Sequence, residues 1–157
     1  MRLANIALVA CVTLTGCEGT DGATVGPRGG TVVSADGRLS LEIAEGALSH
    51  DVDITIDQVD CTAMHLDALG PCYEVGPRGT GFLFPARLTL ELEEADLDDA
   101  GDRELGLWAQ REATWNLLAD RDFDAENGTL AASATYLSSF AVVALPDDDE
   151  RPAPQRH

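Results

Sequence analysis

The sequence predicts an all-β fold, an antiparallel β-sandwich, from three observations. Short segments recur in which aliphatic and polar side chains alternate, which is the period of a strand with one buried face. Turn-forming residues, mainly Asp, Gly, Pro and Asn, separate these segments. No segment carries the sustained apolar stripe of an amphipathic helix. Several short strands at this spacing are typical of two packed antiparallel sheets.

The alternation is clear in three segments and weaker in four others. The clear segments are 39–43, 52–56 and 88–92, and the weaker ones are 105–108, 114–118, 129–134 and 140–145. Turns are expected at 35–37, 45–46, 76–79, 99–101 and 126–128. Residues 93–104 have the composition of a helix but lack a wide apolar face, so we expect an acidic connection there.

The N-terminus has the layout of an export signal. An uncharged apolar run follows Arg2 and ends at small residues. The run covers residues 3–14, which is shorter than the roughly 20 apolar residues that a membrane span needs. We therefore expect a signal that is removed and not a transmembrane helix.

The end of this run, Leu14, Thr15, Gly16 and Cys17, resembles a bacterial lipoprotein signal. The resemblance implies that residues 1–16 are the signal peptide, with Leu14, Thr15 and Gly16 as the signal-peptidase motif. It also implies that Cys17 is lipidated and becomes the first mature residue. The implied location is the bacterial cell envelope, at the outer membrane, on its periplasmic or its surface face. Without lipidation, Cys17 would be an ordinary thiol just past a soluble-secretion signal.

Three further parts are expected beyond the signal. Residues 17–29 are rich in Gly, Thr and Asp, as in a flexible tether. Residues 30–145 hold the sandwich, a length suited to one domain. Residues 146–157 are acidic and proline-rich, so we expect a disordered tail.

The mature chain is strongly acidic. It has 28 Asp and Glu residues against nine Arg and no Lys, which gives a net charge of −19. Such a charge argues against nucleic-acid binding, and it repels anionic lipid headgroups. Attachment to the membrane is therefore expected through the lipid on Cys17 alone.

Two cysteines, Cys61 and Cys72, remain once Cys11 leaves with the signal and Cys17 carries lipid. Outside the cytoplasm such a pair is usually oxidised, so we expect a structural disulfide. A metal site and two free thiols are the alternatives. The nearby histidines do not fit a zinc spacing, and we expect neither a metal nor a cofactor.

Candidate chemistry is sparse. No nucleophile stands beside a base, and no catalytic residues are expected. Residues 96–102 look like a calcium loop, but Ala100 and Leu107 occupy the fifth and twelfth positions, where an EF-hand has ligands. We expect a solvated acidic loop, with weak calcium binding as the open alternative. Trp108 and Trp115 flank an expected chain reversal, where they pack in a hairpin or one of them serves as an exposed anchor.

Residues 29–48 combine a Gly-Gly-Thr strand, an Asp-Gly turn, an alternating strand and a Gly-Ala-Leu turn. Residues 81–90 contain the order Phe-x-Pro-x-x-Leu-x-Leu, and 105–108 and 136–143 are similar to closing strands. Together, residues 29–145 resemble the ZU-five domain (zonula occludens/uncoordinated-five type). The resemblance implies a β-sandwich that contacts protein partners or neighbouring domains.

Some members of that family cleave their own chain at a His-Phe-Ser triplet. The matching positions here are Tyr136, Leu137 and Ser138. Because the pKa of a tyrosine is near 10, Tyr136 cannot replace the histidine as a base near neutral pH. We therefore expect no self-cleavage, and Ser138 is expected to be a strand residue.

The function that these observations predict is a lipid-anchored envelope protein whose non-catalytic sandwich binds or supports another protein or envelope component. The alternative is an envelope lipoprotein that binds a small ligand or calcium through its acidic loops. A large exposed apolar patch favours the first hypothesis, and a deep cleft lined with carboxylates favours the second.

Overall fold

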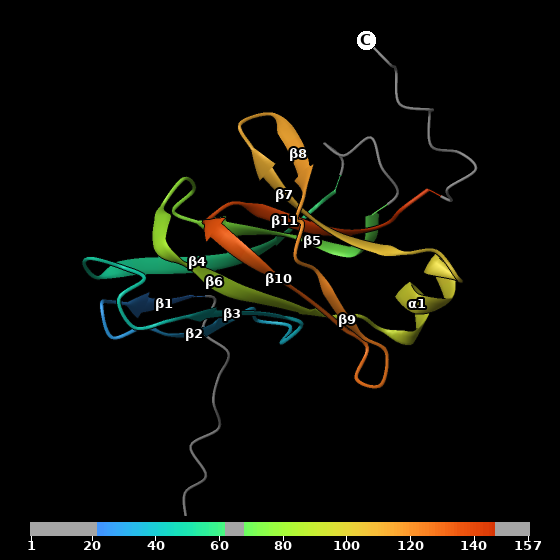
Figure 1. Ribbon diagram of the computed structural model, residues 1–157, viewed down its shortest axis with the longest axis horizontal. Coiled ribbons are helices and arrows are strands. Elements are labelled where there is room, and N and C mark those ends of the chain that lie inside the picture. The colour runs from blue at the N-terminus through green and yellow to red at the C-terminus, as the bar shows by residue number, and fades with distance from the viewer. Residues whose placement is uncertain (1–21, 62–67, 147–157) are drawn as a thin grey trace, which may run out of the picture.

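The computed structural model describes residues 22–61 and 68–146. In this part of the chain two antiparallel β-sheets pack around one apolar core, so the predicted all-β fold with two sheets is confirmed (Figure 1). The six-stranded sheet has the order β1 (Gly22–Val25), β4 (Val52–Val59), β5 (Ala68–Gly76), β11 (Ser139–Ala144), β7 (Leu105–Arg111) and β8 (Thr114–Leu117). The five-stranded sheet has the order β2 (Gly30–Val33), β3 (Leu39–Ile43), β6 (Gly81–Glu91), β10 (Thr129–Tyr136) and β9 (Asp122–Asp124).

All seven segments with alternating side chains lie in or overlap strands. The segment 39–43 coincides with β3, where the three apolar side chains are buried and the two polar ones are not. The same alternation places apolar side chains of β4, β6, β7, β10 and β11 in the core. Its largest fully buried members include Leu39, Leu41, Ile54, Leu88, Leu107, Leu130 and Phe140.

Strand β5 was not predicted, because Gly70 and Pro71 interrupt its apolar pattern. Gly70 has a φ of 68°, in the left-handed region that favours glycine. At this point the register against β11 shifts between the pairs Phe140↔Tyr73 and Val142↔Leu69. Glycine and proline are found inside strands mainly at such bulges, so the interruption marks a bulge and not the end of the strand.

The expectation of a flexible tether over residues 17–29 is wrong for its second half. Gly22–Val25 forms β1, which pairs with β4 from Gly22↔Thr55 to Val25↔Val52. Val25 is buried in the core, and the Thr24 hydroxyl donates to Asp53 at 2.5 Å. A four-residue edge strand is held by backbone bonds and one apolar side chain, which leaves too little pattern for sequence analysis to detect.

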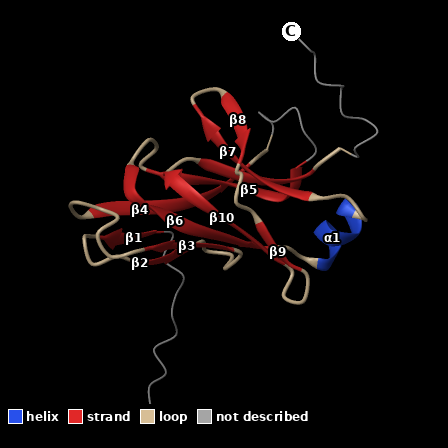
Figure 2. Cartoon of the chain, in the orientation of Figure 1, coloured by secondary structure: helices blue, strands red, loops and turns tan. Residues whose placement is uncertain are grey.

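The expectation of an acidic connection and not a helix over 93–104 is wrong for residues 94–100. Residues Glu94–Ala100 form a short helix, α1, at one end of the sandwich (Figure 2). The backbone N–H of Glu93 donates to Asp96 at 2.9 Å in a capping box, and the helix ends at Gly101, whose φ is 60°. Its apolar side consists of Leu97 and Ala100 only, so capping compensates for the narrow apolar face.

Both ends of the chain, residues 1–21 and 147–157, and the internal segment 62–67 lie outside the described residues. These include the signal motif Leu14, Thr15 and Gly16, the lipidation candidate Cys17, and most of the expected tail over 146–157. Within the described ranges, no helix is long and apolar enough to cross a bilayer.

Candidate functional site

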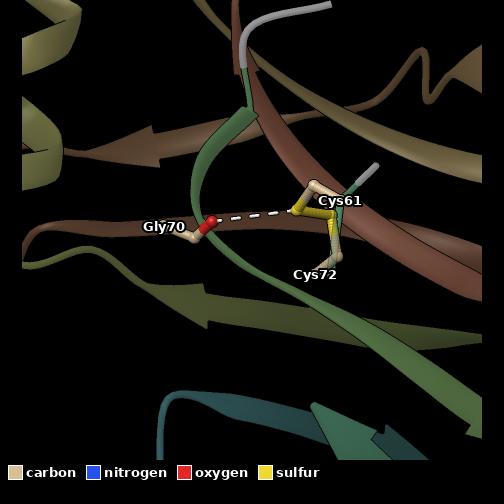
Figure 3. The surroundings of a disulfide bond; sticks show 3 residues. All are labelled: Cys61, Gly70 and Cys72. Carbon is tan, nitrogen blue, oxygen red and sulfur yellow. Dashed lines mark hydrogen bonds between the residues drawn. A yellow bond between two sulfur atoms is a disulfide. The ribbon is translucent and has the colours of Figure 1, made fainter. Parts of the chain in front are cut away.

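Cys61 and Cys72 form the expected disulfide, with 5.4 Å between their Cα atoms. Cys61 follows the end of β4, and Cys72 lies in β5 opposite Val59. The Sγ atom of Cys61 also lies 3.9 Å from the carbonyl oxygen of Gly70, in the β5 bulge (Figure 3). The bond therefore joins the residues just after β4 to the middle of the adjacent strand β5, beside the bulge, which is a structural position.

The disulfide belongs to a second apolar cluster, on the outer face of the six-stranded sheet. In β11, Phe140 and Val142 face the main core, whereas Ala141 and Val143 face this second cluster. Trp108, Trp115 and Cys61 are partly buried and pack against this second cluster.

Both tryptophans come from the hairpin of β7 and β8, which reverses between Arg111 and Thr114. Hairpin packing, and not an exposed anchor, therefore describes both side chains. Their indole nitrogens are buried without a hydrogen-bond partner among the described residues, a cost of about 1–3 kcal/mol each.

A polar network joins the two sheets around Asp36, which lies in the turn between β2 and β3. Its carboxylate accepts hydrogen bonds from the Ser34 hydroxyl at 2.5 Å, the Tyr73 hydroxyl at 2.5 Å and the Arg38 amide at 3.1 Å. Tyr73 is a fully buried residue of β5 in the opposite sheet. Asp36 therefore ties a turn of one sheet to a core strand of the other.

Arg38 extends this network to α1. Its guanidinium donates to the carbonyl oxygen of Glu91 at 3.1 Å and to the Asp96 carboxylate, and it lies 3.6 Å from Glu93. Asp96 also accepts the capping hydrogen bond from the Glu93 amide. The hydrogen bonds of Arg38 are therefore used within the fold, as expected of a structural network.

The network makes stability depend on pH. Burial raises the pKa of Asp36, but the hydrogen bonds from Ser34 and Tyr73, followed by the Arg38 amide and charge, outweigh it and hold the pKa below its usual range. A carboxyl with a lowered folded-state pKa stabilises the protein above its unfolded pKa of about 3.9, and this contribution is lost as pH falls through the folded value.

We therefore expect the stability difference between the wild type and Asp36→Asn to be constant from about pH 7 to about pH 5 and to shrink below about pH 4. Urea unfolding at a series of pH values measures this difference. Asp120 and Asp124 also have lowered pKa values, and their contribution is common to both proteins and cancels. A difference that stays constant down to about pH 3 would contradict the assignment.

The predicted acidic loop over 96–102 is divided between α1 and the turn that follows it. Asp96 is buried and bonded to Arg38, so its carboxylate is already occupied. Among the residues that the structure describes, no group of three or more His, Cys, Asp or Glu side chains is placed to hold a metal ion.

Ser138 lies in the two-residue connection between β10 and β11, not in a strand as expected. It is buried, and its hydroxyl donates to the carbonyl oxygen of Gln110. Its own carbonyl accepts from the Val75 amide at 2.8 Å. Its hydroxyl and its carbonyl oxygen thus bond to backbone groups, which fix the connection in place.

The most exposed large apolar side chains belong to a bulge in β6. The pairs Ala134↔Ala86 and Tyr136↔Gly81 leave four residues of β6, 82–85, opposite a single residue of β10. In this β6 bulge, defined as residues 82–85, Leu83 is 70 % exposed and Phe84 is 58 % exposed. Two adjacent apolar side chains therefore project from a surface that is otherwise rich in acidic residues.

The β6 bulge is held in a defined position. The Leu83 amide donates to the carbonyl oxygen of Ala47 at 2.9 Å. The Phe84 ring lies close to Gly46, where a Cβ atom would meet it at 3.5 Å. These contacts hold the backbone at Leu83 and the ring of Phe84 against the turn after β3.

No family model matches the chain, and no curated protein matches it at a significant level.

The β6 bulge lies within residues 81–90, one of the segments that resemble the ZU-five domain, but its exposure was not predicted from the sequence. The register shift against β10 is set by pairing between distant segments, so nothing local marks it. The partnership of Asp36 and Tyr73 was missed for the same reason, because 37 residues separate them in the chain.

Proposed function

We propose that this chain is a lipid-anchored envelope protein whose sandwich is a non-catalytic module that binds another protein. The observation that carries the proposal is the β6 bulge, where the consecutive residues Leu83 and Phe84 are both exposed. Exposed apolar anchors of this kind are typical of protein interfaces, in which a few residues supply most of the binding energy. The ZU-five-like motifs of the sequence agree with this proposal.

The proposed anchor limits where the domain stands. Because β1 begins at Gly22, only four residues separate it from Cys17. Four extended residues reach about 14 Å, so a lipid on Cys17 would hold this edge of the six-stranded sheet close to the bilayer. Strand β8 lies at the opposite edge of the same sheet.

The strong negative charge fits the same arrangement. It repels anionic headgroups and so keeps the protein surface free for a partner. Nothing in this function requires a cofactor or a reaction. The Ser138 hydroxyl, which donates to the carbonyl oxygen of Gln110, has a structural role in this proposal.

The interface is tested with Leu83→Ser/Phe84→Ser. The intact lipidated protein is cross-linked in envelopes, solubilised in detergent and captured, and the affinity for its cross-linked partner is then measured. We expect binding at least about tenfold weaker in the variant, because a truncated apolar anchor costs more than 1 kcal/mol. The matched control is Val33→Ser/Phe123→Ser, which removes two other exposed apolar side chains. Equal binding by both variants would contradict the proposal that the β6 bulge is the binding interface.

The anchor is tested separately with Cys17→Ser. The mass of the wild-type protein should include a diacylglyceryl group on Cys17, and the variant should leave the membrane fraction. An unmodified Cys17 would reduce the proposal to a secreted soluble protein.

A further inference from the structure

A cleft of about 700 Å³ opens where three connections of the chain meet. They are the turn between β5 and β6, the turn between β7 and β8, and the connection between β10 and β11. Arg78, Gln110, Arg111 and Tyr136 supply most of its long polar side chains. A cleft with a few polar groups from several connections has the form of a small-molecule site.

Hydrogen bonds fix the three connections to one another. The Gly79 amide donates to the carbonyl oxygen of Leu137 at 2.8 Å, and the Leu137 amide donates to that of Thr80 at 2.8 Å. The hydroxyl of Ser138 donates to the carbonyl oxygen of Gln110. The cleft is therefore formed in advance, so a ligand would not have to order its walls.

Hydrogen-bond donors are in excess in this cleft. Arg78 lies 3.2 Å from Glu74 and donates to Oε1 of Gln110 at 2.7 Å. Because this oxygen of Gln110 accepts, the amide nitrogen of the same side chain remains a donor. Arg78 thus orients Gln110 while Glu74 balances its charge.

Arg111 is the cation left for a ligand. Its guanidinium carbon lies 5.6 Å from the centre of the Tyr136 ring, and it forms no ion pair with any described residue. The contact with the ring holds the side chain while its N–H donors stay unpaired. Of the arginines that the structure describes, Arg28 and Arg111 have no hydrogen bond or ion pair within the described residues. Only Arg111 of these two lines the cleft.

We infer that the cleft binds a carboxylate attached to an apolar or aromatic group. Arg111 contacts the carboxylate through two N–H groups, the geometry that a planar guanidinium favours, and the amide of Gln110 adds a donor. The Tyr136 ring offers apolar contact to the rest of the ligand. Glu112 is the single acidic residue in the lining, and it opposes binding of more highly charged ligands. The inference does not depend on the lipid anchor or on the β6 bulge.

The probe is N-acetyl-phenylalanine, titrated into the isotope-labelled, detergent-solubilised full chain, with its amide as the uncharged counterpart. We expect a Kd of about 1 mM, the range usual for a ligand of this size, with amide shifts confined to the three connections. Arg111→Gln should weaken binding at least about tenfold. Arg87→Gln, which removes the same charge from an exposed site outside the cleft, should leave the Kd unchanged.

A second variant separates binding from folding. Glu112→Gln removes the opposing carboxylate and should strengthen binding about threefold, a gain that a purely structural role of the turn would not produce. Glu126→Gln is the charge-matched control at an exposed turn.

A short peptide that ends in phenylalanine distinguishes two sources of the carboxylate. Tighter binding of the peptide than of N-acetyl-phenylalanine points to a protein C-terminus, and equal binding points to a small acid. Equal binding of acid and amide, or equal effects of Arg111→Gln and Arg87→Gln, would overturn the inference.

Discussion

Replacing Arg38 with methionine is expected to lower the free energy of unfolding by roughly 3 kcal/mol at neutral pH. The guanidinium bonds to Asp96, to the Glu91 carbonyl oxygen and, at longer range, to Glu93. Only 14 % of the Arg38 side chain and 12 % of the Asp96 side chain is exposed. Methionine keeps the aliphatic stem but leaves a nearly buried carboxylate without its counter-ion, and this unpaired charge dominates the expected loss.

Chemical denaturation measures the loss, and two further variants test its cause. Arg87→Met removes an arginine that is 52 % exposed and lies 3.6 Å from Asp122, so a change below about 0.5 kcal/mol is expected. Arg38→Met/Asp96→Asn should recover part of the loss, because no unpaired charge remains. If Arg38→Met costs no more than Arg87→Met, the network around Arg38 is not a structural element of the fold.

Strands with one buried face could be predicted from the sequence, because apolar and polar side chains alternate along their consecutive residues. Strand β3 is the clearest case, since its bounds coincide with the alternating segment 39–43. Strand β5 was missed because a bulge at Gly70 breaks the alternation, although pairing with β11 is present on both sides of the bulge. Helix α1 was not predicted for a related reason. Its capping and its ion pair with Arg38 stabilise it in place of a wide apolar face, and the apolar pattern does not record them.

The features of the surface were harder to predict than the fold. The disulfide could be inferred from the number of cysteines and the expected compartment. The β6 bulge and the cleft beside Arg111 depend on register and on connections that are far apart in the chain. Such features arise from pairing between strands, so the residue types alone do not reveal them.

Removing the disulfide with Cys61→Ala/Cys72→Ala is expected to lower the free energy of unfolding by at least about 3 kcal/mol. The bond closes a loop between residues separated by 11 positions, and a loop of this length restricts the unfolded chain by roughly that amount. Loss of packing adds to it, because Cys72 is buried against Ala141 and Val143 in the second apolar cluster. Trp108 and Trp115, the two tryptophans of the chain, belong to the same cluster, so their fluorescence reports its unfolding.

Reduction provides an independent route to the same state. The wild type in a strong reductant should unfold at nearly the denaturant concentration of the double variant, whereas the reductant should leave the double variant unchanged. The single variant Cys61→Ala also breaks the bond but keeps the buried Cys72 side chain, so its loss isolates the effect of the cross-link from that of packing. Because the closed loop restricts mainly the unfolded chain, we expect the single variant to retain most of the loss. If the single variant instead matches the oxidised wild type, the stability of this region comes from the apolar cluster and not from the cross-link.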